Sequence, residues 1–493
     1  MTLSENSISY STSKSKEVSG IIAKKELFES TPVPEAIWKL ALPAVLGQII
    51  LVLYNMADTF FVGLTGSDAM LSAVTICMPA FMFLSAVANL FGIGGASVIA
   101  RAMGDGDTKK AGYASAFALW GCLGVTALYS LCAYIWADPF IDLLGGTDPQ
   151  VHVLAKEYLF CTVTLGGLPT AVATLLSHLI RSEGRSLHAS AGIALGGLLN
   201  MALDPLFMFV LLPAGREVLG AAVATSLSNV FALLYFVWVL IRKRKRSCLS
   251  FIPGKAMLSQ AVPMGVLAAG LPACLMTLFE NISFAVLDAL MAVNGISFQA
   301  GLGVAKKVNM LAHCMVRGMA QGVLPLIGYT YASGDHRRMK KTVSLSMGIS
   351  VGLAALCTIV CLLWSRPLIG LFIRHGSDSV RYGADFLRIL CLGAPFSACA
   401  YTCISFFQAT GKGMRSFFLA VFRKGVLDIP LMFLLRTVSP VYGMVWATPV
   451  TDGVCCVLSL VLFAVFLRAH TNLFAPAPKE EAIPASGQKV LCS

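Results

Sequence analysis

Charged residues are scarce in this chain of 493 residues: Asp, Glu, Lys and Arg make up 13% of it, against about 25% in an average soluble protein. Hydrophobic residues make up 57%, and the mean hydropathy is +0.78. Such a chain cannot cover a folded domain with a polar surface, so its composition excludes a soluble globular protein and predicts a multi-pass membrane protein in contact with the lipid bilayer.

The sequence also lacks the common catalytic and cofactor motifs. H-E-x-x-H, G-x-S-x-G, P-loop and C-x-x-C patterns are absent, and Gly92 and Gly94 lack the third glycine of a nucleotide fingerprint. The fifteen cysteines lie mostly in apolar stretches, where free cysteine packs as a small hydrophobe. We therefore expect no enzyme activity and no cofactor. Activity of the purified protein on a hydrolysable substrate would reopen the alternative of a membrane-embedded enzyme.

Long apolar stretches are present instead, and a membrane-spanning helix needs about 20 such residues. Polar segments precede and follow them, and we expect residues 1–35, which lack the apolar core of a signal peptide, and residues 471–493 to be disordered tails. The twelve expected spans are 37–62, 71–100, 111–136, 156–180, 187–212, 218–241, 258–293, 297–331, 342–365, 382–409, 415–436 and 441–467.

Positive charge is distributed unevenly between the two sides of these spans. Most Lys and Arg residues lie in the tails and the even-numbered connections, for example the run Arg242–Arg246. Basic connections stay in the cytoplasm, which predicts that both termini are cytoplasmic. The net charge of +12 then reflects topology, and no nucleic-acid partner is expected.

The two halves of the chain resemble each other. Gly104-Asp105 recurs as Gly334-Asp335, Gly184 recurs as Gly411, and Leu203-Asp204 recurs as Leu427-Asp428, with offsets of 230, 227 and 224 residues. Six spans per half make this a parallel repeat. The sequence predicts an all-α membrane protein with two six-helix lobes, 36–246 (N-lobe) and 247–470 (C-lobe), that enclose a central cleft.

Two acids interrupt the apolar spans of the N-lobe, namely Asp58 and Asp204. A carboxylate in hydrocarbon costs about 2.5–3.5 kcal/mol even on the mildest scale, so such a residue is by default part of an ion or substrate pathway. Asn200 lies four residues before Asp204 and shares its helix face. Pro205 frees a backbone carbonyl one turn earlier, and all these oxygens suit a hard cation such as sodium, or a proton.

The loops and spans together resemble the multidrug and toxic compound extrusion (MATE) family, in its bacterial multidrug branch, over residues 37–467. The resemblance rests on strings that occur in order along both halves. They are Leu42-Pro43, Asp58–Gly63 (DTFFVG), Gly94–Ser97 (GGAS), Arg101–Asp105 (RAMGD), Arg181–Arg185 (RSEGR), Asn200–Pro205 (NMALDP), Gly220–Thr225 (GAAVAT), Gln321–Pro325 (QGVLP), Gln408–Gly411 (QATG) and Gly443–Trp446 (GMVW).

The resemblance implies a cation or proton site built from Asp58, Asn200, Asp204 and Thr225, with sodium held by the first three if sodium is the ion. Glu280, Asp288 and Asp428 add acids to the C-lobe, and a second ion or substrate site there is a further hypothesis. Tyr54 and Met201 are candidates to line the cleft. The alternative for each acid is an internal ion pair. Lys306, Lys307, Arg423 and Lys424 are the available partners.

Taken together, these features predict a secondary active antiporter in the bacterial inner membrane. By resemblance, it exports amphipathic, often cationic, small molecules by alternating access, acts as a monomer and exchanges them for protons or sodium ions. The alternative is a flippase for lipid-linked saccharides, which needs a cationic cavity for a diphosphate. Lys306, Lys307 and Arg317 favour it, and the acids within the spans disfavour it.

Overall fold

The structure is a computed structural model that describes residues 26–469 except 145–147, 214, 260 and 373–376. All regular structure in these residues is helical, which confirms the predicted fold class. Among the described residues, nine helices are long and apolar enough to cross a membrane. They are α2 (Val33–Leu64), α3 (Asp68–Gly104), α4 (Thr108–Ile135), α8 (Ser186–Leu206) with the π-helix η2 (Phe207–Leu211), α9 (Glu217–Arg242), α10 (Ala261–Ala292), α11 (Ile296–Ala332), α12 (His336–Leu363) and α18 (Tyr442–Ala469).

Three expected spans are interrupted helices. The first, α6 (Pro149–Leu159) with the π-helix η1 (Phe160–Leu165), bends by 48° before α7 (Gly167–Ser182). The second bends by 41° between α14 (Ser377–Cys391) and α15 (Ala394–Ala409). The third, expected at 415–436, consists of α16 (Gly413–Val421), the π-helix η5 (Phe422–Asp428) and α17 (Ile429–Val438). None of its pieces is long enough to span by itself, and the π-helix in the middle holds three buried charged residues, Arg423, Lys424 and Asp428.

Short helices occupy the connections of the described chain. They are α5 (Ala137–Leu143), η3 (Arg244–Arg246), η4 (Lys255–Leu258) and α13 (Ser365–Gly370).

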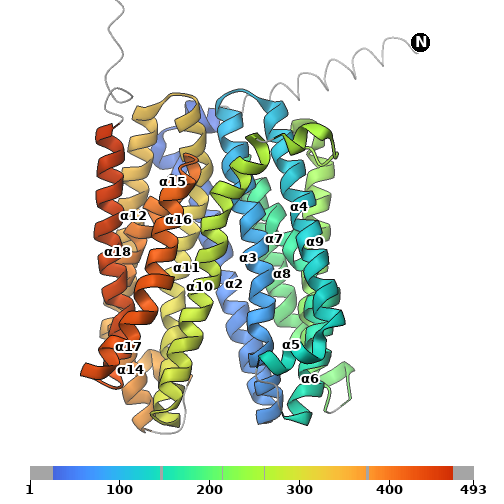
Figure 1. Cartoon of the computed structure of the whole chain (residues 1–493), viewed down its shortest axis with the longest axis vertical. Coiled ribbons are helices and arrows are strands. Elements are labelled where there is room, and N and C mark those ends of the chain that lie inside the picture. Colours follow the sequence, from blue (N-terminus) through green and yellow to red (C-terminus); the bar gives the residue numbers. More distant parts are fainter. Residues whose placement is uncertain (1–25, 145–147, 214, 260, 373–376, 470–493) are drawn as a thin grey trace, which may run out of the picture.

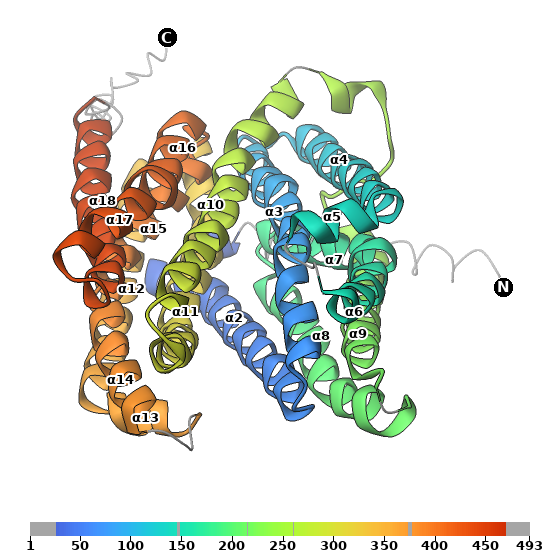
Figure 2. The ribbon, with the colours of Figure 1, turned by 60° about the horizontal axis from the view of Figure 1, so that its bottom comes forward.

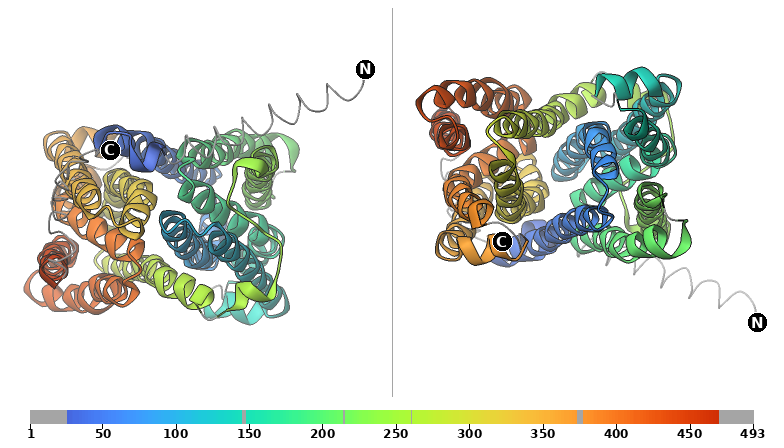
Figure 3. Two further views of the ribbon diagram at one scale, coloured as in Figure 1. Left: turned by 90° about the horizontal axis from the view of Figure 1, so that it is seen from above. Right: turned by 90° about the horizontal axis from the view of Figure 1, so that it is seen from below.

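The helices form two groups that lie side by side, blue to green and yellow to red in Figures 1 and 3. Helices α2 to α9 form the N-lobe, and α10 to α18 form the C-lobe. Helices α2 and α10 lie at the boundary between the groups, as Figure 2 also shows. This arrangement agrees with the predicted repeat.

Helix α2 and the residues before it are ordered further toward the N-terminus than we expected. Phe28 is buried, and its ring stacks on Tyr329 of α11 with 4.8 Å between centroids. Arg338 donates a hydrogen bond of 2.5 Å to the carbonyl of Thr31. Residues 26–35 therefore pack on the C-lobe, and the expectation of a disordered tail was wrong for them. Residues 1–25 and the expected tail 471–493 lie outside the described chain.

One end of the molecule, here named the basic end, carries the connections 105–107, 183–185, 243–246, 333–335 and 410–412, and lies at the top of Figure 1. The lobes touch each other over the half of the molecule that adjoins this end. Gly322 of α11 lies so close to Ala41 of α2 that an added Cβ would come within 2.5 Å of its Cα atom. Gly270 of α10 abuts the carbonyl of Leu90 of α3 in the same way. Backbone contact through glycine therefore closes this half of the molecule.

Candidate functional site

A buried polar cluster joins α8 and α9 inside the N-lobe. Asn200, Asp204 and Thr225 are all buried. The Nδ2 group of Asn200 donates to Asp204 Oδ1 and to Thr225 Oγ1, both at 3.2 Å. Asn200 Oδ1 and Asp204 Oδ2 are buried and have no hydrogen-bond partner. The cluster therefore presents two free oxygen acceptors to the same interior.

Asp58 of α2 is a second buried acid in this region. It is 7% exposed, and its Oδ1 atom also lacks a hydrogen-bond partner. Asp58 lies close enough to Asp204 for the two carboxylates to interact electrostatically, and both also interact with the hydroxyl group of Tyr54. Lys307 of α11 is the cation that acts on Asp58 from the C-lobe, but the two form no ion pair in the described chain. Two carboxylates thus share an enclosed region that contains no cation paired with either of them.

Small residues explain why three helices converge here. Gly197 of α8 packs against Ile50 and Tyr54 of α2, and Gly196 packs against Ala232 of α9. Since neither glycine carries a side chain, α8 approaches both neighbours closely. The i, i+4 spacing of Asn200 and Asp204 then places both on the face directed at Thr225.

Pro205 and the π-helix follow directly after the cluster. Pro205 lies in the last turn of α8, and η2 begins at Phe207. Single π-turns are frequent at functional sites because they re-aim side chains and loosen the helical hydrogen-bond ladder. The oxygens of Asp58, Asn200 and Asp204 that have no hydrogen-bond partner are of the type that binds a hard monovalent cation or a proton. In the part of the chain that the structure describes, no set of three or more His, Cys, Asp or Glu residues suits a metal ion.

A cleft of about 270 Å³ lies between the lobes, next to the cluster. Gln48 and Arg181 of the N-lobe both donate to Gln321 Oε1 of the C-lobe, at 3.2 and 3.3 Å, and link the lobes across it. Tyr54 lines the cleft as predicted, together with Asn200 and Thr225. Met201 does not, because its position on α8, one residue on from Asn200, turns it about 100° away.

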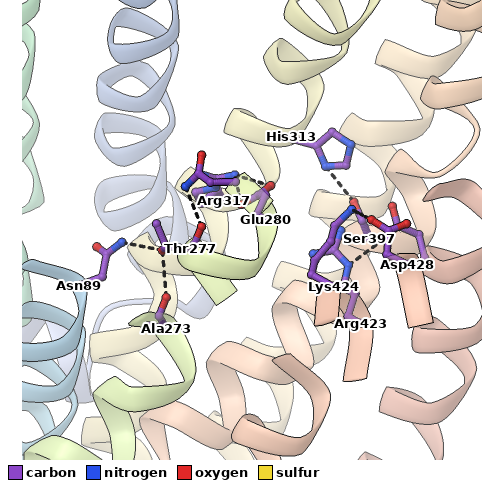
Figure 4. Close-up of polar contacts among 12 residues, drawn as sticks. Asn89, Ala273, Thr277, Glu280, His313, Arg317, Ser397, Arg423, Lys424 and Asp428 are labelled. Atoms are coloured by element: carbon purple, nitrogen blue, oxygen red, sulfur yellow. Dashed lines mark hydrogen bonds and ion pairs between the residues drawn. The ribbon is translucent and has the colours of Figure 1, made fainter. Parts of the chain in front are cut away.

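The C-lobe side of the cleft carries a charge pair. Glu280 of α10 accepts two hydrogen bonds of 3.1 Å from Arg317 of α11, and Figure 4 shows this pair near the contact of Asn89 with Thr277. Glu280 is therefore at the cleft, where the sequence placed a second-lobe site, but its charge is balanced.

The other two acids that the sequence singled out in the C-lobe are internally paired. Asp288 is 45% exposed at its side chain and lies 2.5 Å from Lys306. Asp428 is fully buried and bound to Lys424 at 2.8 Å. These are two of the ion pairs that the sequence offered as the alternative to a functional site, and neither acid lines the cleft.

The structure also shows charged residues that the sequence analysis overlooked. Asp452 of α18 is fully buried and lies 2.7 Å from Arg423 of η5. It falls inside the expected span 441–467, so the criterion that identified Asp204 applies to it equally. Arg181 and His178 of α7 line the cleft, and no motif of the sequence placed them there.

The fold and the site can be compared with known proteins. A family model described as MatE matches residues 43–206 and 272–434, once in each lobe. The Multidrug export protein MepA of Staphylococcus saprophyticus is 26% identical over 445 residues, covering 90% of this chain and 95% of that protein. MepA of Staphylococcus haemolyticus is 25% identical over 436 residues, with 88% and 94% covered.

Solved structures share the fold. One described as the outward-facing conformation of a multidrug resistance MATE family transporter of the MOP superfamily has a TM-score of 0.81 at 24% identity, covering 91% of this chain and 98% of that one. One described as MATE in the straight conformation has a TM-score of 0.82 at 23% identity, with the same shares covered.

Proposed function

Because the chain belongs to the MatE family, we propose that it is a multi-pass membrane antiporter that exports amphipathic, often cationic, small molecules. It exchanges them for protons or sodium ions by alternating access and acts as a monomer. The related MepA proteins are multidrug export proteins and align over nearly their whole length, which supports the substrate class. No cofactor has a part in this proposal.

One observation carries the coupling mechanism. Asp58, Asn200 and Asp204 each keep a buried oxygen without a hydrogen-bond partner, beside a cleft that separates two lobes. An unsatisfied buried polar atom costs about 1–3 kcal/mol, and more for a charged group. A cation or proton entering the N-lobe removes that cost, so the conformation that holds it is stabilised.

Exchange follows from the linkage between ion and substrate. An ion bound at Asp58 and Asp204 biases the lobes toward one conformation, and a substrate bound in the cleft biases them toward the other. The membrane potential adds about 2.3 kcal/mol for each net charge moved through 100 mV. This free energy is sufficient to drive export against a concentration gradient.

We place the basic end in the bacterial cytoplasm by the distribution of Lys and Arg. The lobes are in contact over that half of the molecule, so the cleft of this conformation faces away from the cytoplasm. Both termini then lie on the cytoplasmic side of the inner membrane.

The charges of the cleft disfavour a flippase for lipid-linked saccharides. Arg181, Arg317 and Glu280 are the charged residues that line it, and Arg317 is bound to Glu280. A single uncompensated guanidinium remains, which is a weak counterion for a diphosphate. Lys306, which favoured this alternative, is bound to Asp288.

Efflux from proteoliposomes tests the proposal. Asp58→Asn and Asp204→Asn are compared with the wild type under a pH gradient and, separately, under a sodium gradient. We expect Asp204→Asn to lower gradient-driven efflux at least tenfold and Asp58→Asn to do so to a similar extent. Asp138→Asn is the matched control, because Asp138 lies on α5 outside the spans and is 56% exposed at its side chain. Normal efflux by Asp204→Asn under both gradients would refute the site.

A further inference from the structure

The two lobes carry corresponding polar positions on corresponding helices. Asn200 and Asp204 are four residues apart and precede Met208-Phe209; Lys424 and Asp428 are four apart and precede Met432-Phe433. Gly220 and Gly443 each lie five residues before a threonine, Thr225 and Thr448. The C-lobe therefore repeats the carboxylate and the hydroxyl of the N-lobe cluster, and it has lysine where the N-lobe has asparagine.

The lysine is bound inside the C-lobe cluster. Lys424 Nζ lies 2.8 Å from Asp428 Oδ2, which also accepts a hydrogen bond of 2.6 Å from Ser283 of α10. Thr448 of α18 donates to Asp428 Oδ1 at 3.4 Å. Figure 4 shows Lys424 and Asp428 directed at each other beside Arg423. Both oxygens of Asp428 thus have partners, in contrast to Asp204, whose Oδ2 has none.

A second pair balances the remaining charge of the cluster. Arg423 Nε donates to Asp452 Oδ1 at 2.7 Å, and its guanidinium lies 4.7 Å from the ring centre of Tyr401. Lys424, Arg423, Asp428 and Asp452 are each at most 2% exposed. Two cations and two anions thus neutralise each other in the C-lobe, whereas Asp58 and Asp204 have no paired cation in the described N-lobe.

We propose that the ammonium group of Lys424 is a resident cation that occupies the C-lobe counterpart of the N-lobe cation site. A lysine ammonium is a compact single charge on a flexible stem, and here it takes the position that an inbound ion takes beside Asp204. Because it is covalently attached, it is present in both conformations of the transporter, and its presence does not depend on an external ion concentration as that of a free ligand does. The C-lobe therefore binds no external ion. Only the N-lobe couples transport to the ion gradient, and it binds one cation in each transport cycle.

The identity of one residue in each lobe then decides which lobe binds an external cation. Lys424→Asn gives the C-lobe the amide, carboxylate and hydroxyl of the N-lobe, and exposes Asp428 to an incoming ion. Asn200→Lys gives the N-lobe its own resident ammonium beside Asp204. The double substitution moves the external site from one lobe to the other.

Cation binding to the purified, detergent-solubilised full chain tests this inference. Two probes are used: radioactive sodium at equilibrium, and proton uptake in weakly buffered solution. We expect one cation per wild-type molecule, two for Lys424→Asn, none for Asn200→Lys, and one for the double variant. Lys424→Asn that binds the same number as the wild type, with its unfolding transition retained, overturns the proposal. If Lys424→Asn does not fold, Asn200→Lys decides, since a folded Asn200→Lys protein that binds as many cations as the wild type also overturns it.

This inference rests on the proposed cation site of the N-lobe, and one further variant separates the two. Asp204→Asn removes the N-lobe carboxylate, and Asp204→Asn with Lys424→Asn tests the C-lobe by itself. Gain of one cation by this pair of substitutions supports the resident ammonium whatever the N-lobe does. Unchanged binding by Asp204→Asn refutes the N-lobe site but leaves the gain at Lys424→Asn to be judged separately.

Discussion

Buried ion pairs and unpaired acids are the residue-level difference between the lobes. Asp428 and Asp452 form ion pairs with Lys424 and Arg423, respectively. Asp204 and Thr225, in contrast, only accept hydrogen bonds from the amide group of Asn200. A buried ion pair adds little to stability, because desolvation offsets the attraction, but removing one partner leaves a buried charge without compensation. The C-lobe pairs therefore preserve local structure, whereas the N-lobe acids keep buried oxygens without a hydrogen-bond partner.

Removal of one partner of the Arg423–Asp452 pair is expected to destabilise the protein. Asp452→Leu leaves the guanidinium buried without its carboxylate and should cost about 3–5 kcal/mol. Arg423→Leu combined with Asp452→Leu should recover most of the lost free energy of unfolding, because neither side chain of the pair then leaves a buried charge without its partner. Thermal unfolding of the purified protein in detergent measures all three variants.

The control for this prediction is Asp138→Asn. Lys156 donates two hydrogen bonds to Asp138 and holds the pKa of that exposed carboxyl below its ordinary value. Exposed pairs of this kind contribute little, so no measurable change in the unfolding midpoint is expected. A single substitution at Asp452 that is as stable as this control would contradict the argument.

Close packing of helices through glycine is the main feature at the level of elements. Gly322 and Gly318 of α11 face Ala41 and Val45 of α2 near the basic end. These contacts join the two lobes in this conformation and must separate when the cleft opens toward that end. Small residues at helix contacts allow the backbone approach on which membrane helix association depends.

Gly322→Ala is expected to shift the transporter toward the conformation that opens at the basic end. The added Cβ would lie 2.5 Å from Ala41 Cα, and overpacking of this kind costs about 1–3 kcal/mol. Since the cost applies only while the lobes touch, the ratio of the two conformations should change about 5- to 150-fold. Distances between spin labels on the connections 105–107 and 333–335 measure the shift.

Gly303→Ala on the same helix is the matched control, because a Cβ there would meet no heavy atom within 4 Å. The label distances of this variant should equal those of the wild type. Equal distributions for Gly322→Ala and Gly303→Ala would show that the glycine contact does not hold the lobes together.

The connection between the lobes, which follows α9, is held to the N-lobe by hydrogen bonds. Glu183, in the motif Arg181–Arg185, accepts hydrogen bonds from Ser247 Oγ at 2.9 Å and from Cys248 N at 2.7 Å. Arg185 donates to the carbonyl of Arg246 at 2.5 Å. This loop therefore ties the start of the linker to the N-lobe, and part of the motif that carried the family resemblance has a structural role.

Orientation in the membrane is the prediction that belongs to the whole molecule. An epitope inserted between Gly215 and Arg216 should be reached by antibody on intact spheroplasts, because that connection lies opposite the basic end. An epitope between Arg244 and Lys245 should be reached only after the membrane is made permeable. The reverse pattern would place the basic end outside and would invert the proposed direction of export.

Several features of the site followed from the sequence alone. Asn200 and Asp204 share a helix face because of their spacing, and each half holds an acid at the matching position. Thr225 came from the family resemblance, and it accepts a hydrogen bond from Asn200. Met201 does not line the cleft, and the sequence could not show this, since a position on an apolar helix does not reveal which side faces a neighbouring lobe.

The sequence by itself determined most of the spans, the two-lobe repeat and the presence of acids in the apolar interior, because hydrophobicity and spacing along one helix are local properties; it did not show that three spans are interrupted. Only the tertiary structure decided which acids are paired. Lys424 lies four residues before Asp428, so that pair was a candidate in the sequence, but the contacts of Asp428 with Ser283 and Thr448 and the free oxygen of Asp204 were not. Contacts between helices, such as Arg423 with Asp452, depend on which helices approach one another, and residues far apart in the chain set that approach.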